Sequence, residues 1–203
     1  MKRILITISL TVFCILFSTA TFAQENKTEF GIKGGLNLAH INGIVLNMNH
    51  LRPGINAGVF AEHTFNNFIG MQGELLYSMM GVQSSFISGS EIIKATTKND
   101  YIVLPVLAKL YVAKGFSIDL GPQLGYMISS KIKMSTDNVK YFVDSHYDDY
   151  EKLDVALAIG LSYKLGNRFS VSGRCNFGFI ELYNSGGTPV NRVAQFSVGY
   201  RLK

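Results

Sequence analysis

The sequence predicts an all-β fold: an eight-stranded antiparallel up-and-down transmembrane β-barrel with both termini on the periplasmic side. Apolar and polar residues alternate with a period of two along eight segments, as in strands with one apolar face. The connections alternate between long and short, a pattern typical of bacterial outer-membrane barrels. Only 16% of the residues are charged, against roughly 25% in a typical soluble domain.

The N-terminus has the features of a secretory signal peptide. A basic pair precedes an apolar run over 4–17, and a small residue, Ala23, stands directly before Gln24. The apolar run is shorter than the roughly 20 residues that a transmembrane helix needs. We therefore expect a signal peptide over 1–23, cleaved between Ala23 and Gln24, and one outer-membrane barrel domain over 24–203.

Each of the first four segments places large apolar residues on one parity and small or polar residues on the other. These segments span about 29–41, 54–65, 68–80 and 101–112. Asn66 and Asn67 form the short turn between the second and third strands, because asparagine tolerates positive φ. The polar stretches 42–52 and 81–99 are expected to be loops.

The last four segments follow the same rule, at about 116–130, 152–166, 169–180 and 192–203. The stretch from Leu153 to Leu165 alternates most regularly, with large aliphatic residues opposite Ala, Gly and Ser. A face of such small residues would be a poor solvent surface, but it suits the crowded interior of a narrow barrel. The stretches 131–151 and 181–191 are expected to be loops, and 113–115 and 166–168 short turns.

Two prolines interrupt this regular pattern. Pro105 and Pro122 lie inside the fourth and fifth expected strands, and proline cannot donate a hydrogen bond to a neighbouring strand. Since a closed barrel has no edge strand, we expect a β-bulge at each proline.

Charged residues recur on the parity that is expected to face the lumen. This lumen charge network comprises Lys33, Glu62, Glu74, Lys109, Asp119, Asp154, Lys164, Arg174 and Arg201. An unpaired buried charge is costly, so the two signs must pair. We expect Glu62 and Glu74 to pair with Lys109 and Arg174 in a plug that closes the lumen; the alternative is a gated polar pathway.

Aromatic residues on the opposite parity gather near the strand ends. They form two expected belts at the membrane interfaces, made of Phe30, Phe65, Phe116, Tyr163, Phe169 and Tyr200 at the periplasmic side and Tyr77, Tyr126, Phe177 and Phe179 at the outer side. Cys175 has the same parity, and we expect it to face lipid as an inert thiol.

Few residues point to catalysis or to a cofactor. His146, Asp148 and Asp149 lie together in the longest loop, where they would suit a metal site or a rim hydrolase, although solvated loop residues are the favoured interpretation. The remaining histidines have no ligand spacing: His40, His50 and His63. No glycine-rich phosphate loop opens a helix, and the net charge of +5 comes without basic runs. We therefore expect no catalytic residues, no metal, no cofactor and no nucleic-acid partner.

Several motifs, in order, resemble the strands of the PorT-like outer-membrane β-barrel family, which is abundant in Bacteroidetes. They lie at 34–38, 58–62, 73–78, 101–109, 121–122, 174–178 and 199–202. The resemblance covers essentially the whole mature chain and implies an eight-stranded outer-membrane barrel. Some members of that family are linked to a dedicated protein-secretion system. This chain departs from the pattern in ending on Leu202 and Lys203 rather than on a terminal Phe.

The expected function is that of a non-enzymatic outer-membrane barrel with a lumen filled by polar side chains. Its partners would be outer-membrane lipid and, through the loops, other envelope or secretion proteins. Three alternatives remain: a narrow passive porin-like channel, a membrane enzyme acting at the outer rim, and a soluble lipocalin-like binder with the two faces inverted.

Overall fold

The computed structural model describes six stretches of the chain: 27–42, 49–88, 91–135, 140–143, 152–180 and 190–202. The predicted signal peptide, with its cleavage site between Ala23 and Gln24, lies outside the described residues. Among the described residues there is no helix long and apolar enough to cross a membrane.

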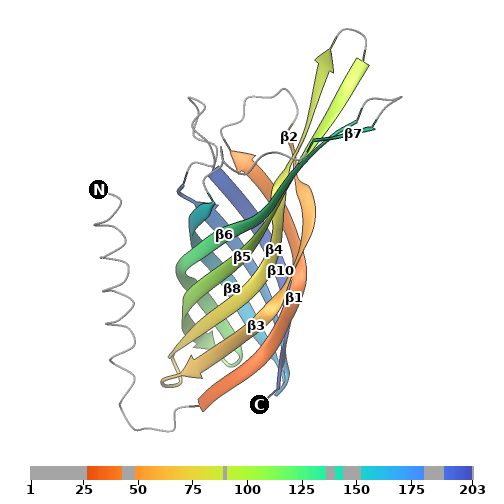
Figure 1. Ribbon diagram of the computed structural model, residues 1–203. Helices are drawn as coiled ribbons and strands as arrows, with labels where there is room; N and C mark the ends of the chain where they lie inside the picture. The colour runs from red at the N-terminus through yellow and green to blue at the C-terminus, as the bar shows by residue number, and fades with distance from the viewer. Residues whose placement is uncertain are drawn as a thin grey trace, which may run out of the picture.

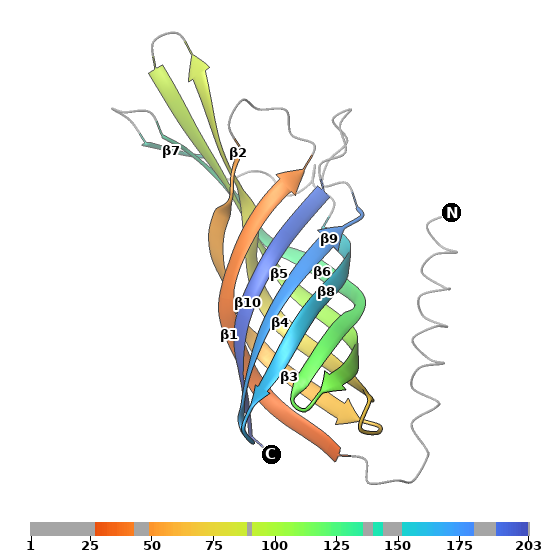
Figure 2. The ribbon, with the colours of Figure 1, turned by 180° about the vertical axis from the view of Figure 1, so that it is seen from behind.

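Eight long strands close into an up-and-down barrel (Figure 1 and, from behind, Figure 2). They are β1 Lys27–Asn42, β3 Arg52–Thr64, β4 Ile69–Ser88, β5 Glu91–Ala113, β6 Phe116–Ser135, β8 Leu153–Leu165, β9 Phe169–Gly178 and β10 Val190–Arg201. Each strand pairs antiparallel with the next long strand in the chain, and the pairing of β1 with β10 closes the ring. The predicted eight-stranded antiparallel up-and-down barrel is confirmed.

The predicted loop at 81–99 is wrong. β4 and β5 continue through it as a hairpin, in register from Gly81 opposite Lys98 to Ser88 opposite Glu91. Figure 1 shows this hairpin rising beyond the barrel rim together with the end of β6, which runs to Ser135. A sheet that extends beyond the barrel can meet solvent on both faces and needs no apolar face. The polar sequence of this segment therefore did not predict strands.

Two short strands join the projecting sheet on either side. β2 Asn49–His50 pairs with β4, and β7 Lys140–Val143 pairs with β6. Both fall within stretches that the sequence predicted to be loops, because strands of two and four residues are too short to show a period.

The predicted bulges at Pro105 and Pro122 are also wrong. Between β5 and β6, Pro105 lies opposite Gln123 and Ala108 lies opposite Leu120, so the register does not change between these pairs. The register shifts instead between Asp100 and Tyr101, and again near the turn after Tyr111. The strands therefore pass the prolines without an inserted residue, and the outer bulge lies where the barrel wall becomes the projecting sheet.

The short turns achieve their curvature in different ways. No described residue other than glycine has a positive φ, so the expected positive φ at Asn66 or Asn67 is wrong. The side chain of Asn66 instead accepts hydrogen bonds from the amides of Phe68 and Ile69, each at 2.8 Å. The other two turns use glycine at positive φ, 79° at Gly115 and 62° at Gly166.

The barrel is apolar outside and polar inside. On β8 the large side chains alternate outward, whereas Ala156 and Ala158 are buried. On β1, Leu36 is 63% exposed, while the neighbouring Asn37 is fully buried. A lipocalin-like binder would need the opposite arrangement, so the two faces are those of a barrel surrounded by lipid.

Candidate functional site: the charged lumen

The inward-facing side chains form three successive layers along the lumen. From the short-turn end, β1 contributes Glu29 and Lys33 to a charged layer, Asn37 to an amide layer, and Ile41 to an apolar layer. On β4, Glu74 lies in the charged layer, Ser78 in the amide layer and Met80 in the apolar layer, and the buried Leu76 lies between Glu74 and Ser78. Because inward residues recur every second position, one strand contributes to all three layers.

Glu74 lies at the centre of the charged layer. Its Oε2 is 2.7 Å from Nη2 of Arg174, and its Oε1 is 2.9 Å from Nζ of Lys33. All three side chains are at most 6% exposed. Charge-assisted hydrogen bonds of this length are about twice as strong as neutral ones, so Glu74 holds three distant strands together.

A second group of ion pairs surrounds Lys109. Its Nζ lies 3.5 Å from Glu62 Oε2 and 3.3 Å from Asp119 Oδ1. Lys109 also donates to Gln72 Oε1 at 2.9 Å, and Gln72 Nε2 donates to Glu74 Oε1 at 2.6 Å. Gln72 thus links this group to Glu74, so that the charged layer is one connected network.

The network extends to the short-turn end through Glu29. Lys164 forms ion pairs with Glu62 and with Glu29, the latter at 3.4 Å, and Nε of Arg201 lies 3.2 Å from Glu29. The sequence prediction did not include Glu29. Glu29 has the same parity as Lys33 on β1, so the alternating pattern alone could have identified it as an inward-facing charge.

Eight of the nine predicted lumen charges belong to this network, and the ninth, Asp154, does not. Asp154 is 2% exposed and lies nearer the outer end, in register with Gly125. Its Oδ1 has no hydrogen-bond partner among the described residues, and the same is true of the side-chain amide of Gln123 and of Nε and Nη1 of Arg174. Buried polar atoms are usually satisfied by protein or water, so these atoms are the exceptions among the described lumen side chains.

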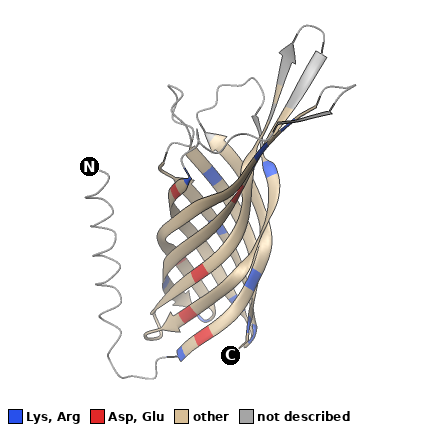
Figure 3. Cartoon of the chain, in the orientation of Figure 1, with Lys and Arg blue, Asp and Glu red and all other residues tan. Residues whose placement is uncertain are grey.

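The charges of the network and Asp154 balance. Five are positive and five negative: Lys33, Lys109, Lys164, Arg174 and Arg201 against Glu29, Glu62, Glu74, Asp119 and Asp154. A further buried cation, Arg52 at the outer end of β3, donates to the carbonyl of Met80. Figure 3 shows both signs distributed around the barrel wall on several strands. A balanced set needs no counterion from solvent, which makes a closed interior electrostatically possible.

A neutral amide layer lies beyond the charges. Asn37 Nδ2 donates to Ser78 Oγ at 2.8 Å, and Asn56 Nδ2 donates to Asn37 Oδ1 at the same distance. Ser197 Oγ donates to Asn56 Oδ1 at 2.9 Å, which joins β10 to this layer. These hydrogen bonds link inward side chains of four consecutive strands, β4, β3, β1 and β10.

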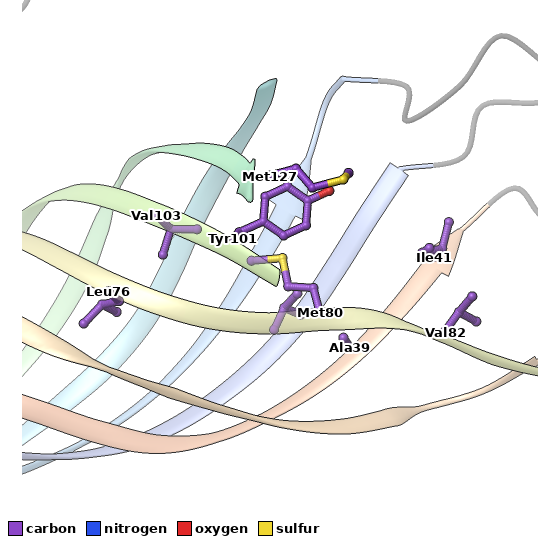
Figure 4. Packing of buried hydrophobic residues seen from close by; sticks show 9 residues of the cluster. Ala39, Ile41, Leu76, Met80, Val82, Tyr101, Val103 and Met127 are labelled. Carbon is purple, nitrogen blue, oxygen red and sulfur yellow. The ribbon is translucent and has the colours of Figure 1, made fainter. Parts of the chain in front are cut away.

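An apolar layer follows toward the outer end. Figure 4 shows Met80, Tyr101 and Met127 close together inside the barrel, and Val103 belongs to the same cluster. Tyr101 is fully buried, and its hydroxyl accepts a hydrogen bond from Asn191 Nδ2 at 3.3 Å. Water and ions cross such a dry layer poorly.

The predicted belt residues lie on the outer face. Seven of them are exposed, namely Phe30, Phe65, Tyr126, Tyr163, Phe169, Phe177 and Phe179, and three are half-buried, namely Tyr77, Phe116 and Tyr200. At the short-turn end, Phe169 and Tyr200 pack with ring centroids 5.2 Å apart, and Arg168 donates to the Tyr200 hydroxyl at 3.1 Å. Cys175 is exposed on the same face.

The candidate rim residues His146, Asp148 and Asp149 lie outside the described residues. Where the structure describes the chain, no group of His, Cys, Asp and Glu side chains is arranged to hold a metal ion. His63 lies near the short-turn end, where its Nδ1 is 2.8 Å from the hydroxyl of Thr28.

A closed barrel with a lipid-type exterior and a charged interior defines the class of integral outer-membrane barrels. A family model described as "Outer membrane protein beta-barrel domain" matches residues 22–184. The chain therefore belongs to this family, and it is a protein of the cell outer membrane.

Two solved structures have the same fold. Two structures of Ail, the attachment invasion locus protein of Yersinia pestis, each cover 87% of this chain and 99% of their own. One is 16% identical with a TM-score of 0.51; the other, with the heparin analogue sucrose octasulfate, is 17% identical with a TM-score of 0.50. Identities this low show a shared fold alone. No curated protein matches the chain.

Proposed function

We propose that this chain is a non-enzymatic outer-membrane barrel whose interior is closed and whose long-loop end engages other envelope components. The PorT-like resemblance suggests assembly of an envelope or secretion machine as one such role. The observation that carries the proposal is the lumen, in which ion pairs, amides and apolar side chains follow one another without a described opening from end to end.

The proposed orientation places both termini in the periplasm. Three short turns lie at the end where β1 begins and β10 ends, whereas the projecting hairpin lies at the opposite end. Bacterial barrels have short periplasmic turns and long outer loops. The projecting sheet would then extend from the cell surface.

Cysteine labelling in intact cells tests this orientation. In a Cys175→Ser background, Met134→Cys at the projecting end is expected to react with a membrane-impermeant maleimide, and Lys114→Cys at a short turn is not. The reverse labelling pattern would contradict the orientation.

Conductance separates the closed barrel from the narrow passive channel. The barrel, folded in detergent and inserted in a planar bilayer, is expected to give no steady conductance steps, with an open porin as the positive control. Steady, reproducible steps would favour the channel and contradict the closed lumen.

The rim enzyme is tested on the loop that carries its candidate residues. The combined replacement of His146, Asp148 and Asp149 by Ala is expected to leave folding and any surface interaction intact. Loss of a hydrolytic activity in that variant would favour the enzyme instead.

A further inference from the structure

A cavity of about 440 Å³ lies at the short-turn end of the barrel. It opens between the turn that joins β3 to β4 and the turn that joins β5 to β6, two turns that Figure 2 shows at the same end of the barrel as the C-terminus. Cavities of roughly 300–1,000 Å³ hold small ligands, so this one has the size of a ligand site. We call it the turn cavity, and its lining includes Asn66, Asn67, Phe68, Tyr111, Lys114 and Lys164.

The wall of the turn cavity nearest the lumen is fixed by the charged network. The Tyr111 hydroxyl donates to Glu62 Oε1 at 2.9 Å, and Lys164 Nζ lies 5.3 Å from the centroid of the Tyr111 ring. Lys164 also forms its ion pairs with Glu62 and Glu29 from this position. An ammonium has three N–H donors, so two ion pairs leave one donor for a ligand.

Three polar side chains on the two turns have unused donors. Asn66 Oδ1 accepts the amides of Phe68 and Ile69, which holds this side chain in one orientation and leaves its Nδ2 without a partner among the described residues. Asn67 and Lys114 are exposed, and the described part of the chain likewise offers their side chains no partner. Because these donors line one cavity, it can bind a group with several acceptor oxygens.

The charge of the turn cavity favours an anion. Lys114 and Lys164 line it, and none of its described lining residues is acidic. The two described carboxylates nearest this end of the barrel, Glu29 and Glu62, are buried and already ion-paired. A ligand carboxylate would therefore meet two ammonium groups, and charge-assisted hydrogen bonds to such groups are stronger than neutral ones.

Apolar side chains lie beside these donors. Phe68 and Val112 are 71% and 59% exposed, and both line the turn cavity. Phe68 is fixed beside Tyr111, whose amide donates to the Phe68 carbonyl at 2.8 Å. Burial of exposed apolar surface is favourable, so the ligand that fits this cavity carries an apolar group next to its anion. An inorganic ion would leave that surface exposed.

We propose that the turn cavity binds the C-terminal carboxylate of a peptide whose last side chain is apolar. Lys114 and Lys164 donate to the carboxylate. Asn66 and Asn67 donate to the last peptide carbonyl, and Phe68 packs against the apolar side chain. Capture of a C-terminal carboxylate is a recurring mode of peptide recognition. The inference goes beyond the proposed function, and it rests on the proposed orientation only for the compartment of the peptide, which is then the periplasm.

Titration of the folded barrel with matched peptides tests the site. The isotope-labelled protein in lipid nanodiscs is titrated with N-acetyl-alanyl-leucine, and the amide NMR signals of Lys114 and Gly115 report binding. The free acid is expected to shift these signals saturably. Its C-terminal amide is expected to bind about tenfold more weakly, because it lacks the charge. N-acetyl-alanyl-glycine, which lacks the apolar side chain, is expected to bind about fivefold more weakly.

Variants at exposed positions locate the peptide. Lys114→Gln leaves the lumen network intact and is expected to weaken binding of the free acid about tenfold. The matched control Lys27→Gln removes another exposed cation at the same end, outside the cavity, and is expected to stay within about twofold. Ala113→Trp fills the cavity from an exposed turn residue and is expected to abolish binding, whereas Ala113→Ser keeps it. Heat-modifiable gel mobility checks that each variant is folded.

Several outcomes would overturn the site. Equal affinity for the free acid and its amide would contradict a carboxylate site, and equal affinity for the leucine and glycine peptides would contradict the apolar contact. Unchanged binding in Lys114→Gln and Ala113→Trp would place the peptide elsewhere. Equal weakening by Lys27→Gln would show general attraction to the basic end. Displacement by acetate at the concentration of the peptide would show a site for small anions. Binding in nanodiscs does not depend on orientation in the cell, so this test fails separately from the labelling and conductance tests.

Discussion

Glu74 and Arg174 face each other across the lumen with 2.7 Å between Oε2 and Nη2, although 100 positions separate them in the chain. Their strands, β4 and β9, are not neighbours in the sheet. This ion pair therefore crosses the interior and ties opposite walls of the barrel together.

Removing Glu74 is expected to be strongly destabilising. Glu74→Ala leaves Lys33 and Arg174 buried without their carboxylate, and breaking a buried pair in this way costs about 3–5 kcal/mol. Urea unfolding of the barrel in lipid vesicles, followed by heat-modifiable gel mobility, measures the loss.

Two controls make this result specific. Lys27→Ala breaks the ion pair between Lys27 and Glu29. The Lys27 side chain is 76% exposed, so this loss is expected to cost less than about 1 kcal/mol. Replacing Lys33, Glu74 and Arg174 together by Met is expected to recover much of the stability. A triple variant no more stable than Glu74→Ala would contradict the pairing.

Tyr101 is expected to act mainly through packing. Tyr101→Phe keeps the ring of this fully buried residue and loses only the hydrogen bond from Asn191, about 1 kcal/mol. Tyr101→Ala opens a cavity in the apolar layer and is expected to cost about 3–5 kcal/mol. Equal losses in the two variants, measured by urea unfolding, would assign the role to the hydroxyl.

Gly58 is required for close approach of two strands. A methyl group at Gly58 would lie 2.0 Å from the carbonyl oxygen of Leu75, whereas one at Gly73 would meet nothing within 4 Å. Gly58→Ala is therefore expected to destabilise by about 1–3 kcal/mol or to block folding.

The matched control for this clash is Gly73→Ala, which is expected to be neutral or slightly stabilising. Folding yields and unfolding midpoints in urea compare the two variants directly. Similar behaviour of both would argue against the register between β3 and β4.

The cost of a charged substitution on the outward face is expected to depend on its depth in the bilayer. Ile159→Arg, near the middle of β8, is expected to cost about 2–4 kcal/mol in a bilayer, and Leu165→Arg, at the short-turn end, about 0–1 kcal/mol. Unfolding from lipid vesicles measures both. If both substitutions were harmless, the outer face would not contact hydrocarbon.

The sequence by itself determined the number of strands in the barrel, the two faces and the parity of the buried charges. Each of these depends on a period of two, which is a local property of the chain, as in the stretch from Leu153 to Leu165. The same alternation places Glu29 on the inward parity with Lys33, so it could have been predicted as a lumen charge.

Only the tertiary structure decided which charges meet. The sequence grouped Glu62 and Glu74 with Lys109 and Arg174 by parity, and the structure contains the Glu62–Lys109 and Glu74–Arg174 pairs. The height of a side chain in the lumen depends on strand tilt and register around the ring, so parity alone could not assign the individual partners or leave Asp154 outside the network. The projecting hairpin and the outer bulge between Asp100 and Tyr101 are likewise set by pairing between strands. Pairing partners are non-local, and they place Lys98 of β5 opposite Lys131 of β6.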